Sequence, residues 1–215
     1  MAIDNPSPLI QCNNITIRFS GRMMIEDLSF TVFPRDKVLL YGQSGIGKTT
    51  IFRMLLGFER IQEGSITFDG KPVDEHSVWD IRKKISYVSQ DTDIGAGPVH
   101  ALLHSFFSYK STKDHRPSKT RIHELLDFFR LPKTVLHEDY EQLSGGEKQR
   151  IELMIAILLE RKIFLLDEAT SALDREIKEE VIDHFLGNRE WTVLSITHDQ
   201  DWLEHKELIV IKVGE

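Results

Sequence analysis

A glycine-rich stretch, GQSGIGKTT, has the residue types needed to hold a nucleotide phosphate. It matches the P-loop pattern, and a predicted strand precedes it while a predicted helix follows, as this motif requires. Glycines let backbone N–H groups converge on phosphate oxygens, the Lys48 ammonium group reaches the β and γ oxygens, and the Thr49 hydroxyl binds Mg²⁺. A chance glycine turn that caps a helix is the alternative, but the full pattern arises by accident in such a chain only about once in a hundred. The predicted nucleotide-binding residues of this loop are Gly42, Gln43, Ser44, Gly45, Ile46, Gly47, Lys48, Thr49 and Thr50.

Two adjacent carboxylates end a second apolar run, IFLLDE at residues 163–168. Asp167, at the tip of this predicted strand, is placed to hold Mg²⁺, usually through water. Glu168 is placed to polarise a water molecule toward the γ-phosphate. A strand that simply ends in a polar turn is the alternative, and taken alone it would be favoured. After a P-loop, a metal and catalytic role is the better interpretation.

A second glycine pair lies in LSGGEKQR, residues 143–150. Ser144 and Glu147 have the Ser-x-x-Glu spacing of a capping box and precede a long apolar-periodic segment. A helix that begins with Ser144, Gly145 and Gly146 presents its positive dipole end and free N–H groups, so it is a second candidate anion site. A well-capped helix without a ligand is the interpretation that would hold for most such matches.

The elements that position these residues alternate between strands and helices. After the first two strands, short apolar strands alternate with helices, which predicts a mostly parallel sheet covered on both faces, with ligands at the carboxyl ends of its strands. We predict an α/β fold with a P-loop NTPase core, an antiparallel β piece at the start and an inserted helical subdomain. Strands are predicted over 9–19, 28–33, 38–41, 64–70, 85–90, 163–166, 192–196 and 208–213, and helices over 48–56, 100–108, 120–130, 145–160 and 174–186.

The chain is predicted to be a single domain over residues 1–215. Residues 1–90 and 143–215 would form the core. From about residue 91 to residue 142 the sequence shows helical periodicity broken by prolines. This pattern indicates a helical subdomain that continues into the helix predicted to begin within LSGGEKQR.

Composition excludes several classes of protein. The net charge of −7 disfavours a general nucleic-acid binder, so no nucleic-acid partner is expected. The single Cys12 cannot form an internal disulfide, which fits a reducing compartment. The start of the chain shows no secretory signal, and the longest apolar run, Leu153 to Leu159, is far too short to cross a bilayer.

Taken together, six motifs resemble those of the ATP-binding-cassette (ABC) ATPases, and the resemblance covers nearly the whole chain. LSGGEKQR looks like the signature motif of that family, and GQSGIGKT and IFLLDE look like its Walker A and Walker B elements. The other three are Gln90, which looks like the Q-loop glutamine, SALD at 171–174, which looks like the D-loop, and His198, which looks like the switch histidine.

The resemblance implies that two copies pair head to tail, with Ser144, Gly145 and Gly146 of one copy against the γ-phosphate held by the P-loop of the other. It implies Glu168 as general base and His198 as a contact to the γ-phosphate and the attacking water. Gln90 would ligate Mg²⁺ together with Thr49 and Asp167, and would report the nucleotide state to the helical subdomain. Asp174 would lie at the dimer seam.

Phe19, in IRFSG, falls where the family places the aromatic that stacks on adenine; an ordinary strand aromatic is an equal alternative. The implied catalytic residues are therefore Glu168, His198, Lys48 and Gln90, and the implied ligands are ATP and Mg²⁺.

The resemblance further implies a separate transmembrane permease as partner and a location in the cytoplasm, peripheral on the cytoplasmic face of the cell membrane. The segment after Gln90 lacks the common pattern of the region where the family docks its membrane subunit. Phe106, Phe107 and Tyr109 would form part of a docking groove or belong to the subdomain core. A basic run would face lipid headgroups or, more simply, be a solvated loop; it comprises Lys110, Lys113, His115, Arg116, Lys119 and Arg121.

Two functions are compatible with these motifs. The leading one is the ATP-hydrolysing subunit of an ABC transporter, which dimerises around two ATP molecules and powers a membrane subunit. The alternative is a soluble ATPase of the same fold that acts in cofactor or complex assembly. The spacing in FFRLPKTVLHEDYEQLSGGEKQR and the string SITHDQDW are similar to those of small bacterial stand-alone ATPase subunits of metal (iron) exporters.

Two departures from the family pattern concern packing. Pro34-Arg35-Asp36 stands where relatives usually have Pro-Gly-Glu, so the turn before the Walker A strand lacks its glycine. An arginine often found near Ile155 is also absent.

Overall fold

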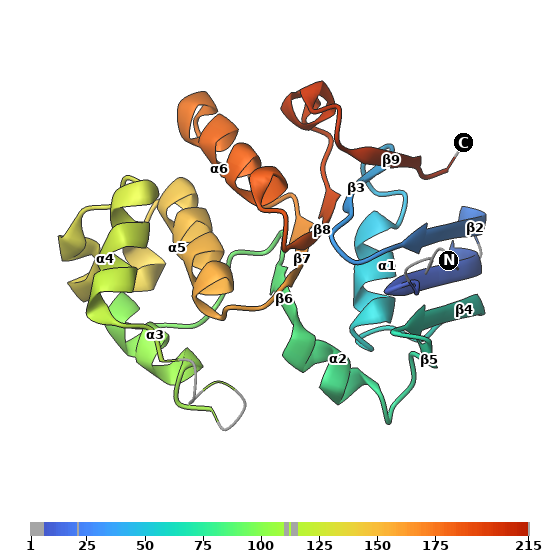
Figure 1. Cartoon of the computed structure of the whole chain (residues 1–215), viewed down its shortest axis with the longest axis horizontal. Coiled ribbons are helices and arrows are strands. Elements are labelled where there is room, and N and C mark those ends of the chain that lie inside the picture. Colours follow the sequence, from blue (N-terminus) through green and yellow to red (C-terminus); the bar gives the residue numbers. More distant parts are fainter. Residues whose placement is uncertain (1–6, 21, 110–111, 113–115, 215) are drawn as a thin grey trace, which may run out of the picture.

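The computed structural model describes residues 7–20, 22–109, 112 and 116–214 (Figure 1). Its elements follow one another in this order: β1 (Ile10–Phe19), β2 (Arg22–Val32), β3 (Lys37–Tyr41), α1 (Lys48–Leu55), β4 (Glu63–Phe68), β5 (Lys71–Pro72), α2 (Val78–Lys84), β6 (Ile85–Val88), α3 (Val99–Phe106), α4 (Lys119–Phe128), η2 (Lys133–His137), η3 (Tyr140–Gln142), α5 (Gly145–Leu158), β7 (Ile163–Asp167), α6 (Arg175–Gly187), β8 (Thr192–Ile196), η4 (Gln200–Glu204) and β9 (Ile209–Lys212).

A parallel sheet with the order β6-β7-β8-β3-β9 forms the centre of the molecule. Strands β6, β7, β8 and β3 are short and mostly apolar, as expected for strands buried on both faces, whereas the edge strand β9 is partly exposed. Successive side chains of a strand point to opposite faces. In β3, Val38 and Leu40 therefore join one core while Leu39 joins the other, and β7 divides Leu165 and Phe164 in the same way.

Different helices cover the two faces of this sheet. On one face, α1 packs between the parallel sheet and the antiparallel sheet, and its side chains Ile51, Phe52 and Leu55 join β1 and β4 residues in a shared core. On the other face, α5 and α6 contribute to the larger core, together with α3 and α4. Figure 1 shows α1 lying between the two groups of strands.

The antiparallel sheet at the start of the chain has the order β2-β1-β4-β5. Its second strand begins at Arg22, so the strand expected over 28–33 was too short at its start. Asn14 and Asp27 both have positive φ and their side chains hydrogen-bond across the pair, where the register shifts. This bulge breaks the alternation that the sequence pattern depends on, which explains the error.

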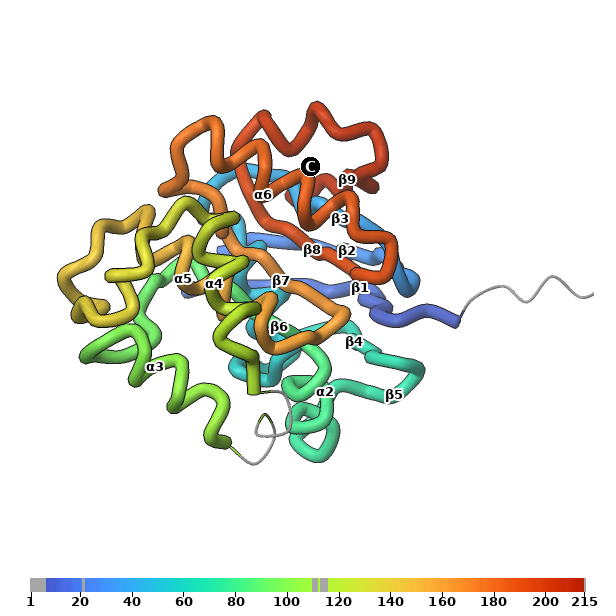
Figure 2. The backbone as a smooth tube through the Cα atoms, turned by 60° about the vertical axis from the view of Figure 1, so that its left-hand side comes forward, coloured from blue at the N-terminus to red at the C-terminus, as the bar shows by residue number. Residues whose placement is uncertain are grey.

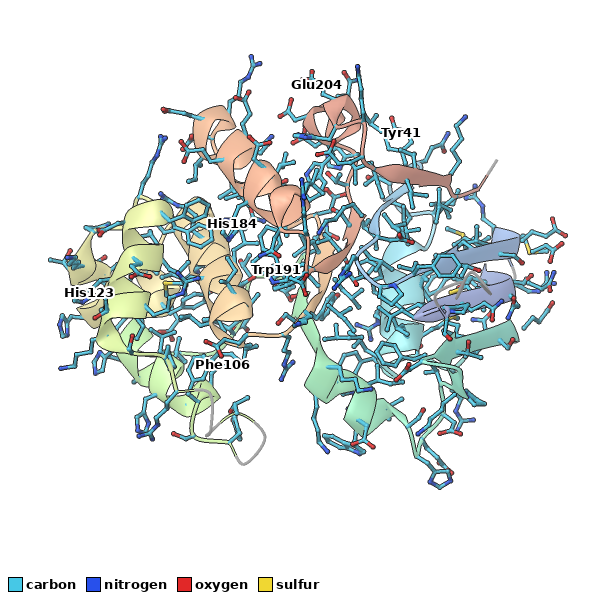
Figure 3. The ribbon with its side chains drawn as sticks, viewed as in Figure 1. Tyr41, Phe106, His123, His184, Trp191 and Glu204 are labelled. Carbon is cyan, nitrogen blue, oxygen red and sulfur yellow. The ribbon has the colours of Figure 1, made fainter. Side chains whose placement is uncertain are left out.

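Helices α3, α4 and α5 lie together to the left of the sheet in both views (Figures 1 and 2). Aromatic side chains join α4 to the core: the ring of Phe128 lies 4.8 Å from that of His184 on α6, and His184 lies 5.4 Å from Trp191. Figure 3 labels His184 and Trp191 at this contact. Burial lowers the pKa of the His184 imidazole, as expected for a ring within an aromatic cluster.

The fold class predicted from the sequence is confirmed, with a parallel α/β core, an antiparallel β piece and inserted helices. Phe107 is only 2% exposed and Phe106 packs against the same core (Figure 3), so the core interpretation holds for both. Tyr109 is exposed. The sequence reading missed α2, a helix of seven residues that has only two buried side chains.

Within the described part of the chain, no helix has the length and apolar character needed to cross a bilayer. Arg116, Lys119 and Arg121 of the predicted basic run are described, and Arg121 pairs with Glu124. Lys110, Lys113 and His115 lie outside the described residues.

Candidate functional site

The predicted phosphate loop connects the carboxyl end of β3 to the start of α1. Gly47 is the residue before the helix and has a φ of 102°, a left-handed conformation that a residue with a side chain rarely adopts. A Cβ atom on Gly47 would lie 3.5 Å from Ile25 and 3.8 Å from Ile17, so the β1–β2 hairpin packs against the loop. The loop therefore combines a helix N-terminus with a close backbone approach, as phosphate binding requires.

Lys48, the first residue of α1, is 5% exposed and folds back over the loop. Its Nζ donates hydrogen bonds to the carbonyl oxygens of Gly42 at 2.7 Å and Gln43 at 2.9 Å. Burial lowers the pKa of Lys48, while the charges of Glu168 and Asp167 raise it. The ammonium group thus bonds to the loop and interacts through its charge with Asp167, the predicted metal ligand, and Glu168, the predicted base.

Asp167 is the last residue of β7 and is fully buried, and Thr49 lies beside it. The Thr49 hydroxyl donates to Oδ1 of Asp167 at 3.1 Å. Tyr87 on the neighbouring strand β6 donates to Oδ2 at 3.4 Å, a contact that the sequence reading missed because it depends on which strand lies beside β7. Burial is the main cause that raises the pKa of Asp167, so this carboxylate lies where a cation would stabilise its charge.

Glu168 leaves the strand with a φ of 51° and is 7% exposed. Its Oε1 lies 3.0 Å from Nδ1 of His198, which follows β8 and has a side chain 65% exposed. Its Oε2 is buried without a hydrogen-bond partner among the residues that the structure describes. A buried unpaired carboxylate oxygen is costly, and it marks a place where a water molecule or ligand would be held.

Helix α5, which begins at Gly145 within LSGGEKQR, has the predicted capping box. The Ser144 hydroxyl accepts from the Glu147 backbone N–H at 3.3 Å, and Oε2 of Glu147 accepts from the Ser144 backbone N–H at 2.9 Å. Ser144 and Gly145 are exposed. This helix start therefore faces solvent, on the element that leads into the larger core.

The remaining predicted residues lie at the ends of strands or helices. Gln90 is exposed just after β6. Phe19 ends β1 with 74% of its surface exposed, two residues after the Ile17 that approaches the loop. Asp174 caps α6 and accepts from the Ile177 backbone N–H at 3.3 Å.

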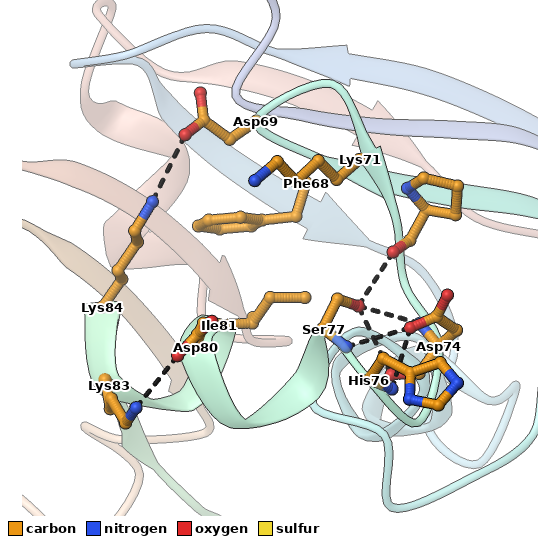
Figure 4. A pocket seen from close by; sticks show the side chains of 11 residues that line it. Phe68, Asp69, Lys71, Asp74, His76, Ser77, Asp80, Ile81, Lys83 and Lys84 are labelled. Carbon is orange, nitrogen blue, oxygen red and sulfur yellow. Dashed lines mark hydrogen bonds and ion pairs between the residues drawn. The ribbon is translucent and has the colours of Figure 1, made fainter.

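Two hollows can be compared with this arrangement. One of about 290 Å³ adjoins the phosphate loop and is lined by Tyr41, Gly42, Gln43, Ser44, His198, Lys212, Val213 and Gly214. A larger one of about 600 Å³ lies between the β4–β5 hairpin and α2 (Figure 4). None of the predicted site residues lines it, and two of its lysines pair with two of its carboxylates, Lys84 with Asp69 at 3.2 Å and Lys83 with Asp80 at 2.9 Å. The smaller hollow is therefore the one that belongs to the candidate site.

Comparisons with known proteins agree with these motifs. Residues 25–171 match the family model described as ABC transporter. The energy-coupling factor transporter ATP-binding protein EcfA1 of Lactiplantibacillus plantarum is 35% identical, over 97% of this chain and 77% of that protein. The probable iron export ATP-binding protein FetA of Escherichia coli is 29% identical, over 95% of this chain and 91% of that protein.

Solved structures share the fold. A bacterial Atm1-family ABC exporter with ATP bound matches with a TM-score of 0.81 and 23% identity, over 99% of this chain and 40% of the exporter chain, so this chain spans two fifths of that protein. The cbiO1 protein of Clostridium perfringens, part of the ABC transporter complex cbiONQ, matches with a TM-score of 0.75 and 21% identity, over 97% of this chain and 87% of that protein.

Proposed function

Because this chain belongs to the ABC transporter family and is an ATP-hydrolysing subunit of that kind, we propose that it pairs head to tail with a second copy around two ATP molecules and drives a separate membrane subunit. The observation that carries the proposal is that one chain has two helix N-termini of the kind that bind phosphate. The first is the N-terminus of α1, where Lys48 interacts with the charges of the Asp167 and Glu168 carboxylates. The second, at α5, exposes Ser144 and Gly145 to solvent, where a second copy would reach them.

In this proposal the loop from Gly42 to Thr50 binds the phosphates of ATP. Lys48 exchanges its bonds to Gly42 and Gln43 for bonds to the β and γ oxygens. Phe19, exposed at the end of β1, stacks on the base. Binding thus uses groups that are already placed by β3, α1 and the β1–β2 hairpin.

Glu168 acts as general base in the proposed reaction. It holds the attacking water at its unpaired Oε2, while His198 fixes the other carboxylate oxygen and contacts the γ-phosphate. Gln90, exposed after β6, joins the site from the side of the inserted helices.

The residues present fit a magnesium ion. Mg²⁺ is held through one or two protein oxygens together with phosphates and waters. Thr49 Oγ1 and Asp167 Oδ1 lie 3.1 Å apart, and the Asp167 carboxylate is fully buried. With Gln90, these residues would hold the ion, which when bound neutralises charge that develops on the phosphate oxygens.

We extend the proposal to the organisation of the chain. Residues 1–90 and 143–215 form the core and about 91–142 the helical subdomain. The segment after Gln90 meets the membrane subunit, with exposed Tyr109 as one contact. The protein would then work on the cytoplasmic face of the cell membrane, bound to that subunit.

The test of the dimer is the size of Glu168→Gln in solution with ATP and Mg²⁺. Loss of the base should leave ATP bound and uncleaved, so the protein should elute as a dimer with ATP and as a monomer without it. Ser144→Arg in the same background is the matched control, because it places a bulky side chain at the exposed helix start and leaves the phosphate loop intact. A Glu168→Gln protein that binds ATP and stays monomeric would refute the dimer.

A further inference from the structure

Gln149 is a buried amide one helical turn after the exposed start of α5, and the site described above does not use it. It is 1% exposed. Its Nε2 donates to the backbone carbonyl of Glu168 at 3.1 Å, with Ser171 Oγ at 3.5 Å. Its Oε1 accepts from the backbone N–H of Ala172 at 2.9 Å. One side chain of α5 therefore holds both ends of the turn from Glu168 to Ala172.

Gly146, on the same helix, contacts this turn as well. A Cβ atom on Gly146 would lie 2.8 Å from the carbonyl oxygen of Ala172, which leaves no room for a side chain. Ala172 thus meets α5 through its N–H, at Gln149, and through its carbonyl, at Gly146. Because these contacts are close and the Gln149 side chain is itself buried, a shift of the start of α5 is transmitted to the turn.

The turn fixes the carboxylate of the general base. Glu168 has a φ of 51°, in the left-handed region that is unfavourable for a residue with a side chain. Its N–H donates to the carbonyl of Ile196 on β8 at 2.8 Å, and its carbonyl accepts from Gln149 and from the Ser171 N–H, each at 3.1 Å. These bonds hold the backbone on either side of the Glu168 side chain, and Gln149 supplies the one that comes from α5.

We propose that Gln149 is a positioning residue that sets the orientation of Glu168 and links it to the chain's own Ser144–Gly146 loop. The inference rests on the proposed function, in which that loop contacts the nucleotide of the partner copy. Occupation of the loop by the partner's phosphate would then be reported, through α5 and Gln149, to the general base of this chain. Each copy would hydrolyse its ATP efficiently only when its loop is engaged.

Two substitutions separate this role from a purely structural one. Gln149→Met has a similar shape but makes neither bond: the N–H of Ala172 loses its bond to Gln149, and the carbonyl of Glu168 keeps the bond from the Ser171 N–H at 3.1 Å. Gln149→Glu is isosteric, and its behaviour depends on pH. The ionised carboxylate cannot donate to the Glu168 carbonyl, whereas a protonated carboxyl has one donor and one acceptor and restores both bonds.

ATP hydrolysis by the two variants and the wild type is measured over pH 6 to 8. We expect kcat of Gln149→Met to fall by about tenfold to a hundredfold at every pH, with KM for ATP changed by less than about threefold, because a misplaced base slows chemistry and not binding. The Hill coefficient for ATP should fall toward one. The ratio of Gln149→Glu activity to wild-type activity should rise as pH falls, and taking the ratio removes any pH dependence that both proteins share.

Arg150→Met is the matched control. Arg150 is the next residue on α5, and it donates to the carbonyls of Gly146 at 3.1 Å and Phe129 at 3.1 Å, both of which lie outside the turn from Glu168 to Ala172. Arg150→Met should lower the melting temperature, and the ratio of its activity to wild-type activity should not change with pH. If Gln149→Met does not fold, the proposal is tested by Gln149→Glu alone, from its activity relative to the wild type at pH 6 and pH 8.

Two results would overturn the proposal. One is a Gln149→Met kcat within twofold of the wild type. The other is a Gln149→Glu to wild-type ratio that does not change with pH. Failure of the proposed dimer gives a different outcome: the wild type then shows a Hill coefficient of one and stays monomeric, while the kcat loss and the pH-dependent ratio still report whether Gln149 positions Glu168.

Discussion

Glu152 on α5 is a carboxyl group in the protein interior, and its removal should stabilise the protein at neutral pH and above. It is 6% exposed, and burial is the main cause that raises its pKa from 4.5 to about 7, helped by the charges of Asp91 and Asp93. The hydroxyl oxygen of Tyr140 lies 2.8 Å from Glu152 Oε1 and 2.8 Å from the carbonyl oxygen of Thr92. One phenolic hydrogen cannot serve both acceptors, so the network is complete only when Glu152 is protonated and donates to Tyr140.

The sign and size of the effect follow from this pKa. The folded form binds the proton more tightly than the unfolded chain, so the free energy of unfolding falls as pH rises from 4.5 to about 7 and is then level. That interval corresponds to about 3 kcal/mol at 1.36 kcal/mol per pH unit. Glu152→Gln keeps the shape, has an N–H donor for Tyr140 and cannot ionise. It should therefore match the wild type near pH 5 and gain about 2–3 kcal/mol at pH 8.

Thermal unfolding without nucleotide, followed by circular dichroism from pH 5 to pH 8, measures this difference. For a chain of this length, about 2–3 kcal/mol raises the melting temperature by roughly 5–10 °C. Glu138→Gln, at an exposed position, is the control and should differ from the wild type by the same small amount at every pH. A Glu152→Gln melting temperature equal to the wild-type value at pH 8, or a gain that does not grow with pH, would refute the reasoning.

Two other substitutions test local features of the fold and the site. Arg35 has a φ of 76° where the turn favours glycine, and its ion pair with Glu190 is exposed, so Arg35→Gly should raise the free energy of unfolding by about 1 kcal/mol in urea titrations; a loss of stability would contradict this. Lys48→Met removes a charged donor from the phosphate loop, so its affinity for ATP in equilibrium binding should fall by roughly thirtyfold to a hundredfold with little change in melting temperature; unchanged affinity would remove Lys48 from the proposed site.

Much of the fold could be predicted because its local signals agree with its tertiary structure. The apolar run before Gly42 becomes β3, and the Ser144–Glu147 spacing becomes a complete capping box. Asp174, expected at the start of a helix, is the residue that caps α6. In each case the pattern depends on neighbours within four residues, and such patterns can be recognised without knowledge of the rest of the chain.

The features of the site that could not be predicted from the sequence depend on contacts between segments that are far apart in the chain. Tyr87 reaches Asp167 only because β6 and β7 are neighbours in the sheet, and the chain between them holds all of the inserted helices. Gln149 looks like one polar residue on an amphipathic helix, and only the position of the Glu168 turn explains why it is buried. Motif reading named the groups expected to touch ATP, but it gave no signal for the residues that hold those groups in place.

Asp167 and Glu168 are adjacent carboxylates with different hydrogen-bond partners, and the difference follows from their backbone conformations. Asp167 is the last residue of β7, so its carboxylate points across the end of the sheet to Thr49 and Tyr87, and both of its oxygens accept hydrogen bonds. Glu168 turns out of the strand with a positive φ, so its carboxylate meets His198, and its other oxygen has no hydrogen-bond partner within the described part of the chain. The first arrangement suits a metal ligand, whose oxygens are fixed, and the second suits a base, which needs a free lone pair for the proton it accepts. The positive φ of Glu168 therefore has a chemical consequence, because an extended residue at this position would continue the strand and direct the carboxylate away from His198.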